Sequence, residues 1–246
     1  MRRFFIDRNN IVNGEVVIAG DLFRHLTRVL RMKPGAQVAL ADGEGGEYSA
    51  VITAIAEERL NVRIETVLAS VAGTAAPAIT LLQGIPKGDR MELILQKGTE
   101  LGAAGFVPFL SSRTIPRLAG EKATERRRRW ERIVMEAARQ SRRPDIPVVA
   151  EISPFSETVR SASQEVRLLL WEGEQQRGLR EFLEVTRQPA SVALLVGPEG
   201  GLSPEEAAEA VSAGFIPVTL GPRILRTETA GLAVLPILQY VWGDVG

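Results

Sequence analysis

From residue 79 to the C-terminus, short apolar runs alternate with longer amphipathic stretches. Short runs rich in β-branched residues are typical of buried strands, whereas apolar residues spaced three and four positions apart are typical of helices. This alternation predicts an α/β fold, in which a parallel sheet is covered by helices on both faces. The expected strands cover residues 79–85, 105–110, 147–152, 166–173, 191–197 and 215–221.

Two of the intervening helices are defined by their apolar spacing. Residues 89–102 end at Gly102 and place one apolar face inward, formed by Met91, Ile94, Leu95 and Leu101. Residues 124–143 have a second such face, formed by Trp130, Ile133, Val134, Ala137 and Ala138. We expect a last, strongly apolar helix after Arg226.

The first 70 residues have a different pattern. Runs rich in β-branched residues cover 16–20, 36–43, 47–55 and 59–68, and one helix at residues 21–32 interrupts them, with Asp21 as its expected cap. In the last run, one side of the strand is expected to hold Leu60, Val62, Ile64 and Val67. Several short strands with one helix predict a small barrel. Residues 69–78 are small and include Gly and Pro, so we expect a linker there.

The chain of 246 residues contains no cysteine, and His25 is its single histidine. Disulfides, cysteine–zinc sites and thiolate nucleophiles are therefore excluded, and a Ser-His-Asp hydrolase is disfavoured. No metal-ligand spacing occurs, so we expect no metal. The most apolar segment, residues 230–242, is shorter than the roughly 20 residues that span a bilayer, and the N-terminus lacks the apolar run of a signal peptide. We expect a cytoplasmic protein without a membrane segment.

The sequence LLVGPEGGLSPEEAAEA joins a buried strand to a helix through the glycine-rich residues 197–201. Ser203 and Glu206 have the spacing of a capping box, and Pro204 suits the first helical position. Ligands of open α/β sheets bind at the carboxyl ends of strands, where this loop lies, and glycines let a ligand approach the main chain. A tight turn without a ligand explains the same residues. Neither G-x-G-x-x-G nor G-x-x-x-x-G-K-[ST] occurs, which argues against the usual dinucleotide and P-loop folds.

Basic residues are concentrated in two segments although the formal net charge is zero. Residues 126–143 hold eight arginines against two glutamates, and residues 1–33 hold seven basic against three acidic residues. A solvated helix face accounts for either cluster by itself. Two clusters on separate domains, one of them beside a predicted barrel, favour binding to RNA, because arginine binds phosphates and stacks on unpaired bases.

Four motifs, together and in this order, resemble a known family: GDRMELILQKGTELG, RRRWERIVMEAARQSRR, LLVGPEGGLSPEE and LGPRILRTETA. The chain is similar along nearly its whole length, HLTRVLR included, to the bacterial 16S ribosomal RNA uridine N3-methyltransferases of the SPOUT superfamily. The resemblance implies a PUA-like RNA-binding β-barrel at residues 1–70 and a methyltransferase domain at residues 75–246. In such domains the C-terminal segment threads through a loop and forms a trefoil knot.

The resemblance also implies a cofactor and partners. S-adenosylmethionine is expected to lie bent in a pocket, with contacts to Trp171, Leu195, Gly197, Glu199, Gly200, Gly201, Leu220, Gly221, Ile224, Leu225, Thr229 and Ala230. The implied substrate is 16S ribosomal RNA of the small subunit, and the family acts as a homodimer. The expected RNA contacts are Arg2, Arg3, Arg24, His25, Arg28, Arg31, Arg139, Arg142 and Arg223.

Two side chains of the implied pocket are candidates for catalysis. Arg226 stands at the start of the last helix, where it can stabilise developing charge on a uracil oxygen. Glu199 is the candidate base or base-orienting residue, and its alternative role is to bind backbone amides and hold the glycine loop. Two other functions stay open: methylation of another atom or RNA by a related SPOUT enzyme, and RNA binding without catalysis in ribosome assembly.

Overall fold

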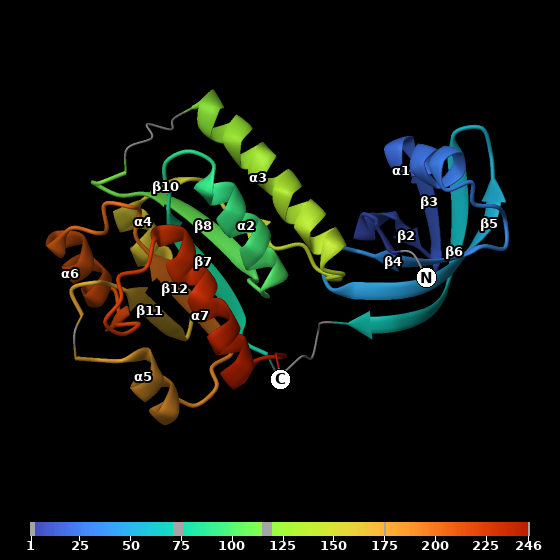
Figure 1. The fold of residues 1–246 in the computed structure, drawn as a ribbon. Helices are drawn as coiled ribbons and strands as arrows, with labels where there is room; N and C mark the ends of the chain where they lie inside the picture. Colours follow the sequence, from blue (N-terminus) through green and yellow to red (C-terminus); the bar gives the residue numbers. More distant parts are fainter. Residues whose placement is uncertain (1–2, 71–75, 115–119, 175, 246) are drawn as a thin grey trace. The chain divides into compact units, whose positions relative to one another are not determined.

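The computed structural model describes residues 3–70, 76–114, 120–174 and 176–245, and the chain divides into two compact units (Figure 1). The first unit is Met1–Thr74 together with Ala138–Ile146, and the second is Ala75–Ala137 together with Pro147–Gly246. Part of the expected linker, residues 71–75, lies outside the described residues. The segment Ala138–Ile146 is attached to the first unit by contacts such as the hydrogen bond from Ile146 N to Gly43 O, 2.9 Å long.

The first unit is built on a six-stranded sheet in the order β1-β4-β5-β6-β3-β2. Its strands are β1 (Arg3–Phe5), β2 (Ile11–Val12), β3 (Glu15–Ala19), β4 (Gln37–Ala41), β5 (Gly46–Ile55) and β6 (Arg59–Ser70). All pairs are antiparallel except β1 with β4. Because successive residues of a strand face opposite sides, alternate apolar residues form one core, which includes Val16, Ile18, Val38, Leu40, Ile52, Leu60 and Val62.

Two expectations for this unit were wrong in detail. The helix forms as α1 (Gly20–Arg24), which continues as a π-helical turn, η2 (His25–Val29), and Ala19 rather than Asp21 is its N-cap residue. The Asp21 carboxylate instead pairs with Arg24. Val67 is 65% exposed. It stands three positions after Ile64, and alternation along a strand places two residues on the same side only at even separations.

The second unit contains a parallel sheet in the order β10-β8-β7-β12-β11-β13, with β9 paired to β8, which confirms the predicted α/β fold. Its strands are β7 (Ala78–Gly84), β8 (Gly105–Leu110), β9 (Val148–Val149), β10 (Ser153–Pro154), β11 (Val166–Leu170), β12 (Ser191–Val196) and β13 (Ile216–Val218). Its helices are α2 (Arg90–Glu100), α3 (Glu121–Gln140), which ends in the first unit, α4 (Phe155–Ser161), α5 (Leu179–Val185), α6 (Pro204–Ser212) and α7 (Thr227–Trp242).

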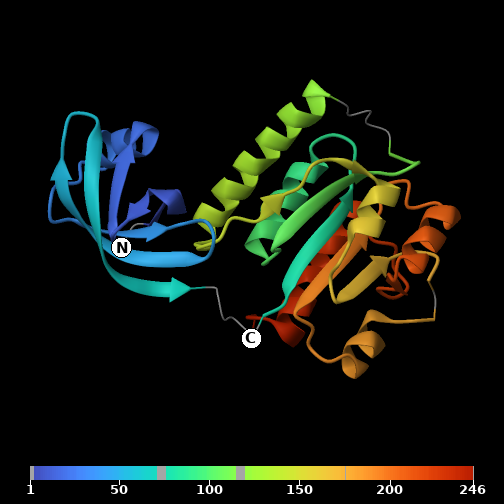
Figure 2. The same cartoon turned by 180° about the vertical axis from the view of Figure 1, so that it is seen from behind.

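Helices cover both faces of this sheet (Figures 1 and 2). On one face, α4 and α6 pack on the strands around a core that includes Phe109, Phe155, Leu169, Leu195 and Ala210. On the other face, α7 lies beside α2 and against β7 and β12. Gly231 makes this close packing possible, because a Cβ atom there would lie 3.0 Å from Leu81 Cδ1. The first turn of α7 is thereby held at the carboxyl ends of the central strands.

Candidate active site

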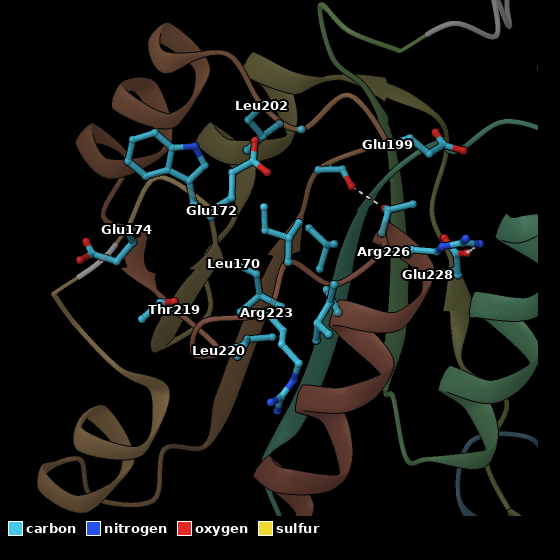
Figure 3. A pocket seen from close by; sticks show the side chains of 18 of the residues that line it. Leu170, Glu172, Glu174, Glu199, Leu202, Thr219, Leu220, Arg223, Arg226 and Glu228 are labelled. Atoms are coloured by element: carbon cyan, nitrogen blue, oxygen red, sulfur yellow. Dashed lines mark hydrogen bonds and ion pairs between the residues drawn. The ribbon is translucent and has the colours of Figure 1, made fainter.

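A cavity of about 780 Å³ opens at the carboxyl ends of β11, β12 and β13 (Figure 3). Its walls are formed by residues from three segments: 170–174 at the end of β11, 196–202 at the end of β12, and 218–230, which leads from β13 into α7. Arg90 at the start of α2 completes the lining. This edge of an open α/β sheet is the usual place for a ligand. The fold therefore gathers three segments that are distant in sequence around one cavity.

The glycine-rich wall, residues 197–201, is held by close backbone contacts. Arg113 Nη1 donates to Gly200 O at 2.8 Å. Gly201 has a φ of 67°, a conformation that glycine adopts without strain. Gly84, the last residue of β7, is needed too, because a Cβ atom there would lie 2.6 Å from Pro198 N. Glycine is thus required where two backbones meet beside the cavity.

The predicted capping box fixes the far end of this wall. Ser203 is the N-cap of α6, its Oγ accepts from Glu206 N at 3.2 Å, and the Glu206 carboxylate accepts from Ser203 N at 2.9 Å. Pro204 occupies the first helical turn, as expected. Glu206 Oε1 also accepts from Ser112 N at 2.7 Å, which ties the loop after β8 to the same point.

A buried polar cluster joins the floor of the cavity to three elements. Gln83 of β7 is fully buried, and its Nε2 donates to Thr227 Oγ1 at 2.8 Å and to Gly84 O at 2.9 Å. Thr227 Oγ1 in turn donates to Gly197 O at 2.5 Å. Because buried polar groups are costly when unpaired, this arrangement fixes the start of α7 against the glycine-rich wall.

Charged side chains from three segments meet at one side of the cavity. Glu199 Oε1 accepts from Lys87 N at 2.9 Å and from the Arg90 guanidinium. Arg90 Nε also lies 3.7 Å from Glu228 Oε1, and Arg226 Nη1 lies 3.9 Å from the same oxygen. Glu228 is largely buried, whereas the Arg226 side chain is 80% exposed. In Figure 3, Glu199, Glu228 and Arg226 lie on the same side of the cavity.

Two family models match the chain. A model described as an RNA methyltransferase domain matches residues 74–239, and one described as an RNA methyltransferase PUA domain matches residues 18–65. The chain belongs to this RNA methyltransferase family. The resemblance predicted from the motifs is therefore confirmed, and with it the fold class of a PUA-like domain followed by a parallel-sheet methyltransferase domain.

Named relatives agree with the family models. Ribosomal RNA small subunit methyltransferase E of Bacillus subtilis is 31% identical over 98% of this chain and 96% of its own length. The protein of that name from Mycobacterium bovis is 33% identical over 94% of this chain and 88% of its own. The crystal structure of ribosomal RNA small subunit methyltransferase E from Neisseria gonorrhoeae, bound to S-adenosylmethionine, is 35% identical, covers 100% of both chains and superposes with a TM-score of 0.84.

Most of the predicted cofactor contacts of the methyltransferase domain line the cavity, namely Trp171, Gly197, Glu199, Gly201, Leu220, Gly221, Ile224, Leu225 and Ala230. Arg223 and Arg226 line it as well. Leu195, Gly200 and Thr229 do not. Leu195 is buried against α4 and α6, and its neighbour Val196 lines the cavity instead, because adjacent residues of β12 face opposite sides of the sheet.

Further residues of the methyltransferase domain line the cavity without having been predicted, namely Arg90, Leu170, Glu172, Glu174, Val196, Pro198, Leu202, Val218, Thr219, Pro222, Thr227 and Glu228. Glu172 and Glu174 lie in the loop that follows the carboxyl end of β11, so the rule that located the glycine loop would have found them. Arg90 lies in the motif GDRMELILQKGTELG. The apolar spacing of that motif indicates only that a helix starts there. The position of Arg90 beside Glu199 depends on tertiary structure.

The expected RNA contacts other than Arg223 belong to the first unit. Arg24, His25, Arg28 and Arg31 are exposed, and the His25 ring lies edge-on to Phe4 with centroids 6.3 Å apart. Arg31 has a φ of 50°, which is uncommon for a residue with a side chain.

The remaining expected contacts have partners within the first unit or are not described. Arg3 pairs with Glu47 at 2.5 Å and donates to Arg142 O. The Arg139 guanidinium lies 5.9 Å from the centre of the Phe5 ring. Arg2 lies outside the described residues.

Over the described ranges, no group of three or more His, Cys, Asp or Glu residues is arranged to hold a metal ion. Among the helices of those same ranges, none is long and apolar enough to cross a membrane.

Proposed function

We propose that this protein methylates N3 of a uridine in 16S ribosomal RNA, with S-adenosylmethionine as methyl donor. The observation that carries the proposal is the cavity at the carboxyl ends of β11, β12 and β13, with Arg226 on its rim. The same fold in the Neisseria gonorrhoeae relative holds S-adenosylmethionine. The names of the relatives specify ribosomal RNA of the small subunit as their substrate.

The residues around the cavity suit S-adenosylmethionine. The volume of about 780 Å³ lies within the roughly 300–1,000 Å³ of typical small-molecule sites. Leu220, Ile224 and Leu225 offer apolar surface to a purine, and the Ile224 side chain is 81% exposed. Glu172, Glu174 and Thr219 supply acceptors for ribose hydroxyls and an ammonium group. Apolar walls with a few polar groups are what such a nucleoside requires.

When bound, S-adenosylmethionine supplies a methyl group on a sulfonium, and the carbon–sulfur bond breaks as the bond from carbon to uracil N3 forms. The protein must align N3 with that bond and exclude water, which can remove much of the barrier. Uracil N3 must also lose its proton, which passes to solvent before the methyl group is transferred and leaves a uracil anion. Arg226, exposed at the rim, donates hydrogen bonds to a uracil carbonyl oxygen and stabilises the negative charge that develops there.

For Glu199 we propose the structural role, that of a brace for the glycine-rich wall. One carboxylate oxygen accepts hydrogen bonds from both Lys87 N and Arg90. These bonds fix the orientation of the carboxylate toward the start of α2. A base needs instead a carboxylate directed at the proton that it removes.

We further propose that residues 1–70 form the RNA-binding module, in which Arg24, His25, Arg28 and Arg31 contact RNA, with Arg223 as a further phosphate contact at the cavity. Exposed arginines favour phosphate contacts because they neutralise backbone charge. We expect the protein to act in the cytoplasm, where bacterial ribosomes are assembled.

We also propose that the protein is a homodimer and that its C-terminal segment forms a trefoil knot. Three large side chains of α7 are exposed, namely Ile237 at 41%, Tyr240 at 72% and Val241 at 45%, and a second copy is the proposed partner of this face. Analytical ultracentrifugation tests the dimer, since a wild-type protein that sediments as a monomer at all concentrations contradicts it. A crystallographic trace of residues 166–242 tests the knot.

The function is tested by mass spectrometry of small-subunit ribosomal RNA from cells with and without the gene. We expect one uridine to lose a methyl group at N3 in the deletion strain and to regain it on complementation. Loss of a methyl group elsewhere indicates a related enzyme with another target. Unchanged RNA, together with no heat on calorimetric titration with S-adenosylmethionine, indicates a protein that binds RNA without catalysis.

A further inference from the structure

Arg90 connects two carboxylates that belong to different walls of the cavity. On one side its guanidinium donates to Glu199 of the glycine-rich wall. On the other side its Nε lies 3.7 Å from Glu228 in the first turn of α7. The Arg90 side chain is 42% exposed and lines the cavity, but beyond its bond to Glu199 nothing so far gives it a role in methyl transfer.

Glu228 lies near both Arg90 and Arg226, the proposed catalytic arginine. Its Oε1 lies 3.7 Å from Arg90 and 3.9 Å from Arg226, both longer than the roughly 2.7–2.9 Å of a charge-assisted hydrogen bond. Only 13% of the Glu228 side chain is exposed, and its buried Oε2 has no hydrogen-bond partner in the described part of the chain. A largely desolvated carboxylate with unused acceptor capacity attracts whichever guanidinium is free to close on it.

We propose that Arg90 is a positioning residue, which balances the charge of Glu228 and so keeps Arg226 free for the RNA substrate. This inference rests on the proposed role of Arg226 in methyl transfer. Without Arg90, Glu228 has one cationic neighbour instead of two, and Arg226 closes on it with direct hydrogen bonds. An arginine held in this way has fewer donors left for a uracil oxygen.

The experiment compares single-turnover methyl transfer, at saturating S-adenosylmethionine and small-subunit RNA, in a set of variants. Arg90→Met is expected to slow transfer about tenfold. Adding Glu228→Gln to the Arg90→Met variant is expected to raise its transfer rate at least about threefold, because the neutral amide no longer holds Arg226. Glu199→Gln in the same background is expected to restore nothing. Arg160→Met, which breaks the exposed pair of Arg160 with Glu209 on α4 and α6, is the matched control and should leave the rate unchanged.

Two different roles of Arg90 would also slow the Arg90→Met variant, and each gives a distinct result. If Arg90 contacts the RNA itself, Glu228→Gln brings no rescue, and the proposal is overturned. If Arg90 only supports the glycine-rich wall, the Arg90→Met variant binds S-adenosylmethionine more weakly by calorimetry, and its transfer rate is normal when S-adenosylmethionine is saturating. That result also overturns the proposal.

A crystal structure of the Arg90→Met variant gives a readout that does not depend on activity. We expect a guanidinium nitrogen of Arg226 to move to about 2.8 Å from the Glu228 carboxylate. If Arg226 keeps its present position, the proposal is wrong. If the wild-type protein transfers no methyl group to RNA, the proposed function fails, while this structural result still decides whether Arg90 holds Arg226 and Glu228 apart.

Discussion

Arginines of the two units look alike in sequence and differ in what holds them. In the first unit, Arg24 pairs with Asp21 three residues away, and both side chains are exposed. In the second unit, Arg90 binds Glu199 across 109 positions of sequence and also approaches the largely buried Glu228. Local exposed pairs contribute roughly 0–1 kcal/mol to stability. Pairs that join distant segments fix the geometry of a site, and this separates Arg90 at the cavity from Arg24 on the first helix. Arg3 of the first unit also pairs across distant segments, with Glu47, but neither residue of that pair lines the cavity.

The largest loss of activity is expected at Arg226, the arginine of the second unit at the rim of the cavity. Replacing Arg226 by Ala should leave the affinity for S-adenosylmethionine nearly intact and reduce methyl transfer by roughly 10²–10³, the usual cost of losing a donor to developing charge. Calorimetry and single-turnover transfer measure the two quantities. Unchanged turnover would remove Arg226 from the mechanism and leave it as one more surface arginine.

The buried cluster of Gln83, Thr227 and Gly197 tests the contrast through stability. Thr227→Val leaves Gly197 O and Gln83 Nε2 without their shared partner, which should lower the free energy of unfolding by about 1–3 kcal/mol. Denaturant unfolding followed by tryptophan fluorescence reports on this unit. The control is Ser212→Ala, which removes an exposed hydrogen bond within α6 and should change that free energy by less than about 0.5 kcal/mol. Equal losses of unfolding free energy in both variants would show that the buried cluster stabilises the protein no more than an exposed hydrogen bond does.

Glu199→Gln distinguishes the two candidate roles of Glu199, namely the structural brace of the glycine-rich wall and the general base. The amide keeps the size of the side chain but loses the charge that holds Arg90. As a brace, Glu199 supports binding and transfer together, so we expect both to fall in proportion, by several-fold. Retained affinity for S-adenosylmethionine with a collapse of transfer would instead identify Glu199 as the base.

The difference between local contacts and contacts that join distant segments also explains what could be predicted from the sequence. Periodicity located β8 at its observed bounds, and the Ser203–Glu206 spacing identified the capping box, because each depends on neighbours along the chain. The assignment of Val67 to the buried side of β6 was wrong, because Val67 lies at an odd separation from Ile64 and is exposed. Leu195 was assigned to the cofactor because a loop motif does not show which face of β12 is turned to the cavity. Arg90 was missed because its partners lie in other segments, which no local pattern displays.

The exposed arginines of the first unit should give the smallest and most uniform effect. Arg28→Ala and Arg31→Ala should each weaken RNA binding a few-fold and lower the slope of log affinity against log salt by about one, as expected when one phosphate contact is lost. Transfer at saturating RNA should not change, because neither residue belongs to the unit that holds the cavity. Filter binding across a salt series and single-turnover transfer test this directly, with Arg180→Ala as the control, since that exposed arginine pairs with Glu184 within α5. A drop in the saturated rate of either barrel variant would mean that these arginines place the target uridine rather than merely hold the RNA backbone, and the contrast between the two regions would then have to be redrawn.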